Sequence, residues 1–541
     1  MSTRQLGRGV AGAAAMIAAL TLLARLAGFG RTLVFTNAVG ADSTGDTYTT
    51  ANNVPNIVFE VVAGGALASL VVPMLAGGIA AGNRDQVRHT ASALLTWAVL
   101  VLTPLALAVA LFAEPIARLL LGEGDPARVA LAGRFLLVFA PQVVLYGIGI
   151  VLAGVLQAHR RFAAPALAPL LSSVVVAAAY LLFAAMGGSR TVAGLSTPAE
   201  LVLGVGTTLG VVALSLNLLV PVRRLRLGLR PTLRFPVGAG LRVRRLALAG
   251  VLTLAGQQLV AAVAIRLAND GTPSGTQVVY FAGMTLFLVP WAALAVPLAT
   301  SAYPGLAERA ELGDDEGFRR SLAPTAVMVV VVCAAAAAIL VAVAGPMARV
   351  FFLHDPTGKV VATRDTILAF APGLVGYGLV ALLTRTLYAR GLWKAPTVCV
   401  AGGWLLAAIS DVALSASLPV AHRGIALAAG HSIGVTVAGI ALLAVVVRVV
   451  GTGALTGLAR TAGPALLGAV LGAAGGLAVL HVLGADPVPD ARAVPAIAVG
   501  LLSGATVLVI VVAVMMVTAR GPLAATLRGL RAWERQEVHG D

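Results

Sequence analysis

Long apolar stretches, separated by short polar segments, follow one another along nearly the whole chain. A helix of about 20 apolar residues spans a bilayer, and fourteen such stretches fit into the 541 residues. Because lipid offers the backbone no hydrogen-bond partner, each stretch is expected to be an α-helix. The pattern predicts an all-α polytopic membrane protein. The predicted spans are 10–36, 47–80, 90–113, 129–157, 163–187, 200–222, 246–269, 275–304, 321–344, 365–389, 395–420, 424–447, 461–483 and 494–518.

Composition supports this interpretation, and the placement of charge orients the spans. Hydrophobic residues make up 59% of the chain and charged residues only 11%, whereas soluble domains have about 25% charged residues. Of the 38 Lys and Arg residues, 25 fall in the terminal segments and the even-numbered loops, and 8 in the odd-numbered loops. By the positive-inside rule, both termini are predicted to be cytoplasmic. The net charge of +16 therefore reflects topology, and no nucleic acid is expected as a partner.

The segment 223–245 carries the highest density of positive charge. It holds eight arginines separated mainly by apolar residues. This composition favours a basic cytoplasmic linker that lies on anionic membrane lipids. A specific headgroup or protein site is the alternative.

An internal repeat relates two six-span halves. At a constant offset of 231 residues, Phe139-Ala-Pro141 matches Phe370-Ala-Pro372, and Tyr146-Gly147 matches Tyr377-Gly378. An offset of six spans keeps both halves in one orientation, as in transporters with two pseudo-symmetric lobes around a central site. The repeat favours alternating access. The predicted domains are an N-lobe at 1–222, the linker at 223–245, a C-lobe at 246–450, two further spans at 451–520 and a cytoplasmic tail at 521–541.

Ionisable residues lie inside the first two spans, where they are costly and suggest function. Arg25 and Arg31 belong to span one, and Glu60 belongs to span two. Span two returns through the membrane, which brings Glu60 to about the depth of Arg25. Two interpretations stay open: the pair only neutralises itself, or both residues line a site for a charged headgroup.

The second half has fewer such residues. Arg385 and Asp411 are its deeper ionisable pair, and His431 is expected to make a helix-packing hydrogen bond. A carboxylate in mid-span should be protonated or hold a cation, so Asp411 is a candidate site for a coupling ion, Na⁺ or H⁺. The membrane potential is the other candidate driving force. The sequence shows no nucleotide-binding or catalytic motif, so we expect a transporter without a cofactor, not an enzyme.

The motif Arg25-Leu-Ala-Gly28-Phe-Gly-Arg31 resembles the MviN/MurJ lipid II flippase family of the MOP (multidrug, oligosaccharidyl-lipid, polysaccharide) superfamily. The resemblance continues through Gly45-Asp46-Thr-Tyr48 and Asn52-Asn53-Val-Pro55-Asn56-Ile-Val-Phe-Glu60. It covers the first twelve spans and is strongest with the high-GC Gram-positive branch. One difference is the absence of an arginine near Met284, in span eight, where many members carry one.

The resemblance implies a MOP-exporter-like fold in the bacterial cytoplasmic membrane. The implied substrate is the undecaprenyl-pyrophosphate-linked precursor of peptidoglycan, lipid II, moved from the cytoplasmic to the outer leaflet, and the implied partners are the cell-wall synthesis and division machinery. Two guanidinium groups could clamp the pyrophosphate. The residues expected to bind substrate are Arg25, Arg31, Asp46, Asn53, Asn56, Glu60 and Arg385, and Asp411 is the candidate ion site.

Three other functions remain open at this point. A flippase for another polyprenyl-linked saccharide would differ only in its headgroup contacts. A drug/cation antiporter is disfavoured because arginines in the cavity would repel cations. A non-transporting scaffold would have no need of the two-lobed repeat.

Overall fold

The computed structural model describes residues 3–61, 67–122, 124–234, 239–355, 357–485 and 492–521. The density of contacts divides the chain into two units, Met1–Val278 and Val279–Asp541. The described residues form helices and connecting loops, with no β-strand among them. The all-α polytopic fold predicted from the sequence is confirmed.

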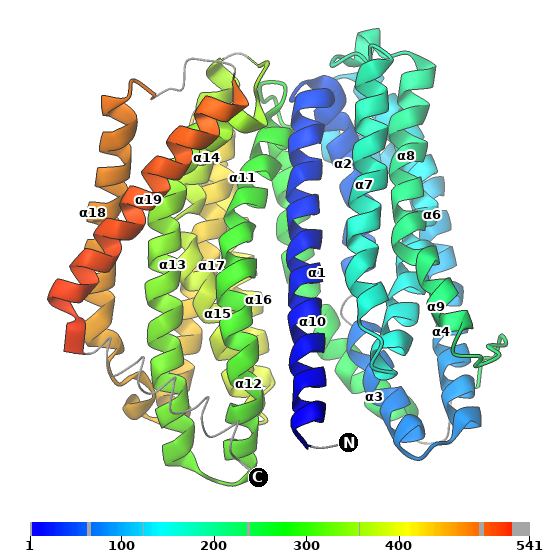
Figure 1. Cartoon of the computed structure of the whole chain (residues 1–541). Coiled ribbons are helices and arrows are strands. Elements are labelled where there is room, and N and C mark those ends of the chain that lie inside the picture. Colours follow the sequence, from blue (N-terminus) through cyan, green and yellow to red (C-terminus); the bar gives the residue numbers. More distant parts are fainter. Residues whose placement is uncertain are drawn as a thin grey trace. The chain divides into compact units, whose positions relative to one another are not determined.

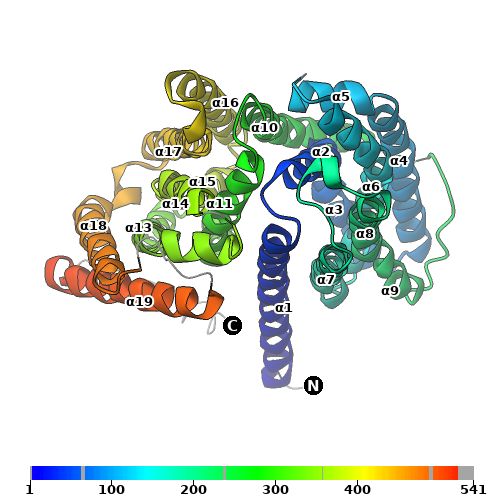
Figure 2. The ribbon, with the colours of Figure 1, turned by 90° about the horizontal axis from the view of Figure 1, so that it is seen from above.

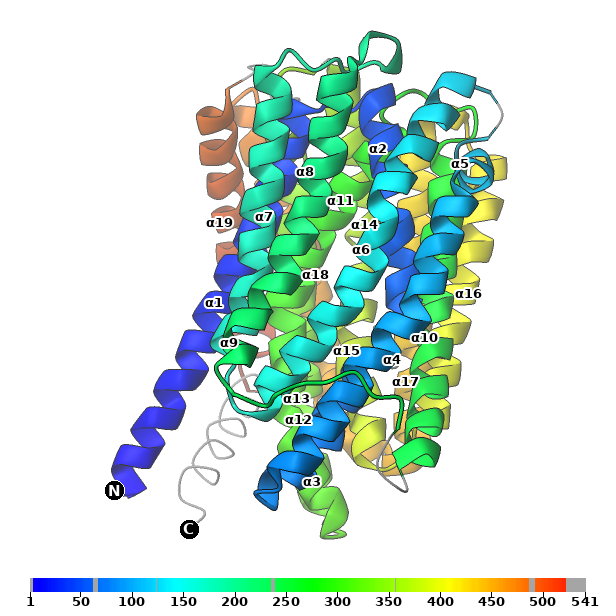
Figure 3. The same cartoon turned by 90° about the vertical axis from the view of Figure 1, so that its right-hand side faces the viewer.

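In unit 1, helices run back and forth along one direction (Figure 3). The most extensive packing within the unit joins α4 to α6, α7 to both α1 and α8, and α2 to α6. The α-helices are α1 (Thr3–Ala38), α2 (Ser43–Phe59), α3 (Leu67–Ala80), α4 (Arg84–Leu111), α5 (Ala113–Leu121), α6 (Pro126–Ala158), α7 (Ala163–Ala185), α8 (Thr197–Ser215), α9 (Leu219–Arg223) and α10 (Ala239–Ala268).

In unit 2, close helix packing depends on small residues. Gly403 of α16 faces Gly434 and Ala438 of α17, and a Cβ at Gly403 would lie 2.9 Å from the Gly434 carbonyl oxygen. Small residues allow such approach between membrane helices, and Figure 2 shows α16 and α17 side by side. The unit contains most of α11 (Thr276–Pro290), followed by α12 (Val296–Glu311), α13 (Asp315–Phe351), α14 (Thr357–Phe370), α15 (Gly373–Ala389), α16 (Lys394–Ser417), α17 (Arg423–Val450), α18 (Leu458–Val482) and α19 (Ala493–Thr518).

The last two helices pack on the same unit. Figure 1 shows α19 crossing α18 beside α13. The Ser503 hydroxyl of α19 donates to the carbonyl oxygen of Gly476 in α18 at 2.9 Å, and it also contacts that of Ala342 in α13 at 3.3 Å. These contacts hold the two extra helices to the body of unit 2.

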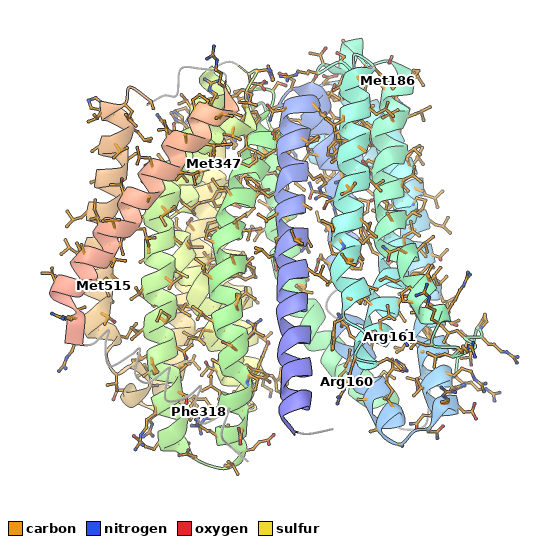
Figure 4. The ribbon with its side chains drawn as sticks, in the orientation of Figure 1. Arg160, Arg161, Met186, Phe318, Met347 and Met515 are labelled. Atoms are coloured by element: carbon orange, nitrogen blue, oxygen red, sulfur yellow. The ribbon has the colours of Figure 1, made fainter. Side chains whose placement is uncertain are left out.

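Outside residues 62–66, which the structure does not describe, each of the fourteen predicted spans lies mainly on one or two helices. Among the described residues, ten helices are long and apolar enough to cross a membrane. The number is eleven when α14 and α15, which are bent by 45° relative to each other, count as one span. Figure 4 illustrates one crossing: Arg160 and Arg161 lie at the turn before α7, and Met186 lies at its other end.

Two spans contain an irregular turn that hydropathy does not predict. After α2, Glu60 and Val61 adopt a π-helical turn, and after α11 a π-helix covers Trp291–Ala295. In the second turn the N–H of Val296 donates to the carbonyl oxygen of Trp291, five residues back. Trp291 lies 231 residues after Glu60, so the irregular turns begin at the same position of the repeat. Single π turns inside helices are frequent at functional sites.

The contacts divide the chain at Val278, and α10 contacts α2, α3 and α5 of unit 1. The predicted lobe limits, which follow the repeat, stay a prediction. The described part of the predicted linker is non-helical from Arg224 to Arg234, and α10 already begins at Ala239. The predicted tail lies outside the described residues except for Gly521.

Candidate functional site

Arg31 lies within electrostatic reach of three tyrosines of unit 1. Its guanidinium acts electrostatically on the hydroxyl groups of Tyr48, Tyr146 and Tyr180. Tyr48 and Tyr180 are buried, with their hydroxyl oxygens 2.8 Å apart, and the Tyr48 hydroxyl is 2.6 Å from that of Thr207. The half-buried Arg31 has no ion-pair partner among the described residues. It is therefore a cation within a membrane span whose charge no described carboxylate neutralises.

Glu60, in the π turn that follows α2, lies near the same tyrosines. The half-buried Glu60 acts electrostatically on Tyr146, whose ring lies 4.8 Å from that of Phe59. Tyr146 thus lies within electrostatic reach of both Arg31 and Glu60. The site in unit 1 combines a guanidinium, a carboxyl group and an aromatic pair.

Arg25 differs from Arg31 in its surroundings. It is exposed, and no ion pair joins it to Glu60 in the part of the chain that the structure describes. The ion pair between Arg25 and Glu60, which would neutralise both charges, is therefore not formed in this conformation. The amides of Asn53 and Asn56 donate to carbonyl oxygens one turn back in α2, at 2.7 Å and 2.9 Å. Substrate binding by these residues stays a prediction.

Asp46 is buried in the first turn of α2 and holds the start of α11. Its carboxylate oxygens accept the backbone N–H groups of Gly275 at 2.6 Å and Val278 at 3.1 Å. A helix N-terminus carries partial positive charge and unpaired N–H groups, so a carboxylate there is stabilising. Gly275 has a φ of +98°, and a Cβ there would lie 2.1 Å from the Ala41 carbonyl oxygen. Only glycine permits this close approach.

A second set of hydrogen bonds fixes the end of α10 to α2, next to the hydrogen bonds of Asp46. The buried Asn269 amide donates to the Thr50 hydroxyl at 3.1 Å, and its oxygen accepts from the Arg128 guanidinium at 2.8 Å. Arg128 also donates to the Thr47 hydroxyl at 3.3 Å. Because Asp46 and Thr50 are four residues apart, they share one face of α2. Together they hold both ends of the segment 269–278, which we call the latch.

In unit 2, Arg385 of α15 is half-buried. One of its terminal nitrogens donates to the Ala381 carbonyl oxygen of the same helix at 2.7 Å. Tyr303 and Tyr388 lie within its electrostatic reach. Its predicted role as a substrate ligand stays a prediction.

Asp411 is fully buried in α16, as expected for a mid-span carboxyl group. Neither carboxyl oxygen has a hydrogen-bond partner among the described residues, and the Ser415 hydroxyl one turn further also lacks one. The carboxyl group packs so closely on Gly430 of α17 that a Cβ there would lie 2.1 Å from Oδ1. An unpaired carboxylate in such a place is unfavourable, so this group either carries a proton or holds a cation.

His431 differs from the expectation. It is buried, and its Nε2 has no hydrogen-bond partner among the described residues. Its ring is instead enclosed by four aromatic rings at centroid distances of 5.4 to 6.2 Å. The expected packing hydrogen bond is therefore absent from the described contacts of this residue, because aromatic side chains occupy the positions around the ring. These side chains are Phe287, Phe370, Tyr377 and Trp404.

The two repeat-related sites have different chemistry. Trp291, which corresponds to Glu60, stacks on Tyr377 with centroids 4.4 Å apart and donates its indole N–H to the Tyr377 carbonyl oxygen at 3.2 Å. Tyr377 corresponds to Tyr146. The first half therefore presents charged groups around its tyrosine, and the second presents aromatic rings.

Several residues of these sites carry little sequence signal of their role. Tyr146 stands out in the sequence only through the repeat, and nothing in the sequence predicts the pairing of Asn269 with Thr50 and Arg128. A search for charges inside spans passes over a tyrosine and over an asparagine at a helix end. The recurrence of Tyr146-Gly147 as Tyr377-Gly378 was the one signal that pointed to this tyrosine.

Comparison with known proteins identifies relatives. The family model described as "Lipid II flippase MurJ" matches residues 35–484. The lipid II flippase MurJ of Burkholderia cenocepacia is 28% identical over 169 residues, which cover 30% of this chain and 32% of the relative. The probable lipid II flippase MurJ of Vibrio cholerae is 23% identical over 416 residues, which cover 74% of this chain and 76% of the relative. The chain thus spans about a third of the first relative and three quarters of the second.

Solved structures share the fold. A lipid II flippase MurJ in an inward closed conformation has a TM-score of 0.70 at 18% identity, covering 91% of this chain and 98% of that one. An inward-facing multidrug resistance MATE family transporter of the MOP superfamily has a TM-score of 0.64 at 14% identity, covering 81% and 95%. At these identities the likeness concerns the fold alone.

Proposed function

This chain belongs to the lipid II flippase MurJ family, and from that premise we propose that it moves lipid II from the cytoplasmic to the outer leaflet by alternating access. The observation that carries the proposal is Arg31. A guanidinium inside a membrane span with no described ion-pair partner is costly unless a ligand brings negative charge. A pyrophosphate offers that charge in a form that a guanidinium can bind with two hydrogen bonds.

The groups around Arg31 suit the rest of such a headgroup. The rings of Tyr146 and Phe59 offer an apolar face, and Glu60 offers an acceptor for hydroxyl or amide donors. Arg25 is close enough in sequence to supply a second guanidinium, six residues from Arg31 in α1. In this proposal the first half recognises the charged headgroup. The aromatic site of the second half does not.

The latch then closes the outer end of unit 1. The charge distribution along the chain supports cytoplasmic termini, which puts the turn before α2 and the segment 269–278 on the outside. For substrate to leave outward, the first turn of α11 must part from α2, which breaks the hydrogen bonds of Asp46 and Asn269. Asp46 thus acts as a closing residue in the conformation described here.

Restored growth of a bacterial strain depleted of its own lipid II flippase is the expected result when this chain is expressed there. Membrane accumulation is measured in parallel by immunoblot. Rescue by the wild-type chain supports lipid II as the substrate. Normal accumulation without rescue would contradict the proposal and favour a different polyprenyl-linked saccharide.

Asp411 is proposed to carry the coupling ion. Asp411→Asn removes the negative charge but keeps the side chain's size, so any sodium dependence of transport should disappear. The measurement compares flipping by reconstituted protein in sodium and choline buffers. Asp270→Asn, which changes an exposed carboxylate paired with Arg266, is the matched control. Sodium dependence that survives in Asp411→Asn would remove this residue from the ion site.

A further inference from the structure

The described part of the basic linker forms an ordered strip along unit 1. Beyond α9, the chain from Leu225 to Arg234 runs across the unit towards α4 (Figure 3). We call this segment the linker strip. Its backbone is fixed by three hydrogen bonds to α4: the N–H of Arg230 donates to the Ser92 hydroxyl at 3.0 Å, that of Thr232 to the Thr96 hydroxyl at 3.1 Å, and the Trp97 indole donates to the Leu233 carbonyl oxygen at 3.0 Å.

The spacing of these bonds explains how the segment 230–232 of the strip pairs with α4. Residues 230 and 232 are two apart in an extended chain, a repeat of about 6.6 Å. Ser92 and Thr96 are one turn apart on one face of α4, a repeat of about 6 Å. The two distances match, so the hydroxyls of Ser92 and Thr96 accept the N–H groups of Arg230 and Thr232, which point from the same edge of the strip. An extended segment would otherwise leave these N–H groups unpaired.

The side chains of the strip divide by chemistry. Leu225, Leu227 and Leu229 pack against the apolar core formed by α3, α4, α6 and α7. The arginines of the strip alternate with them and are exposed, as are the two arginines just before the strip. None of these five has an ion-pair partner among the described residues. They are Arg223, Arg224, Arg226, Arg230 and Arg234.

Trp97 indicates the depth of the strip. It is 37% exposed and lies where the strip meets α4. Tryptophans with an apolar ring and a bonded N–H gather at membrane–water interfaces. The strip therefore lies at the level of the lipid headgroups, with its arginines facing outward.

We propose that the linker strip is a preformed binding surface for anionic lipid headgroups of the bilayer. Charge complementarity selects this occupant: unpaired guanidiniums at headgroup depth meet phosphates, and guanidiniums bind phosphate bidentately. Because the backbone is already fixed, binding orders only side chains. The proposal concerns the lipid around the protein, so it does not depend on which substrate is transported.

Quenching of Trp97 by brominated lipids tests the proposal. The full-length protein is reconstituted in vesicles in which either phosphatidylglycerol or phosphatidylcholine is brominated on the same acyl chain. The fluorescence lost in Trp97→Phe gives the signal of Trp97 alone. An anionic surface attracts each nearby basic residue about five-fold more strongly than a neutral one. We define the preference as the ratio of Trp97 quenching by brominated phosphatidylglycerol to quenching by brominated phosphatidylcholine. For the wild-type protein we expect this ratio to be at least about three.

Two variants separate a fixed strip from general positive charge. The triple change Arg226→Gln, Arg230→Gln and Arg234→Gln should bring the preference close to one. The pair Ser92→Ala with Thr96→Val keeps every arginine but removes two of the three hydrogen bonds between α4 and the strip, and it should lose at least half of the preference. Thermal unfolding in pure phosphatidylcholine should match the wild type for the triple variant, which shows that it is folded.

The matched control removes the same charge elsewhere in unit 1. Arg84, Arg160 and Arg161 are exposed, and their combined change to Gln should leave the preference unchanged. A wild-type ratio near one, or an equal fall in the control, overturns the proposal. An unchanged ratio in the triple variant overturns it as well and would leave a protein partner as the occupant of the strip. An unchanged ratio in Ser92→Ala with Thr96→Val would also overturn the proposal of a preformed surface, because charge alone, without the fixed backbone, would then select the lipid.

Discussion

Arg31→Ala is expected to abolish rescue of a flippase-depleted strain while the protein still accumulates in the membrane. Losing a charge-assisted contact to a buried anion costs roughly 2–5 kcal/mol, which is a loss of affinity of about 30-fold or more. Arg31→Lys should recover only part of the activity, because an ammonium keeps the charge but not the planar pair of donors. Rescue is scored by growth at matched protein level. Arg88→Ala, at an exposed arginine paired with Asp85, is the control.

The double variants distinguish a ligand-binding arginine from one that only neutralises Glu60. If neutralisation were its role, Arg31→Ala with Glu60→Ala would restore growth, because both charges are removed together. The same holds for Arg25→Ala with Glu60→Ala. We expect both double variants to fail. Recovery of either would show that the corresponding arginine serves the balance of charge and does not bind substrate.

Asp46→Ala is expected to open the outer end of unit 1 and to stop transport. The change leaves the Gly275 and Val278 N–H groups without their acceptor. Hydrogen bonds to a charged group contribute about 1.5–3 kcal/mol each, so their loss should raise the open fraction at least ten-fold. The measurement is the labelling rate of Val54→Cys by a membrane-impermeant maleimide added outside, in protein with Cys333 and Cys399 replaced.

Several controls make this measurement specific. Val54 is buried one turn beyond Thr50 in α2, so its labelling reports opening of the latch. Asn269→Ala should also raise labelling, and Asp85→Ala, at the start of α4, should not. Ala193→Cys in the exposed 191–196 loop should be labelled in every variant. Unchanged labelling of Val54→Cys in folded Asp46→Ala protein would show that the carboxylate does not hold the outer end closed.

The helices were predictable because membrane spans are encoded by hydropathy over long windows. All fourteen predicted spans fall on helices, and the burial of Asp411 follows from its mid-span position. The π turns at Glu60 and Trp291 were not predictable in this way. They arise from a shift of one backbone hydrogen-bond partner, which leaves the hydropathy of the segment unchanged. The short helix α5, between two spans, was likewise too short to give a hydropathy signal.

The candidate site can be located from the sequence where it rests on charge but not where it rests on pairing. Arg31 and Glu60 were found because charge inside an apolar span is rare. The partners of Asp46 are backbone N–H groups more than 200 residues away, and a backbone group has no residue type that a sequence could reveal. One of the two open interpretations, an Arg25–Glu60 ion pair, rested on equal depth in the membrane, and equal depth does not fix the direction in which a side chain points around its helix.

The π turns at repeat-equivalent positions also bear on how the two halves come to differ. In such a turn the backbone N–H donates to the carbonyl oxygen five residues back instead of four. Both halves begin the irregular turn at the same position of the 231-residue repeat, but the side chain there is an acid at Glu60 and an indole at Trp291. The same irregular backbone therefore presents a charged group in one half and an aromatic ring in the other, so one residue type at this position sets the chemistry of each half.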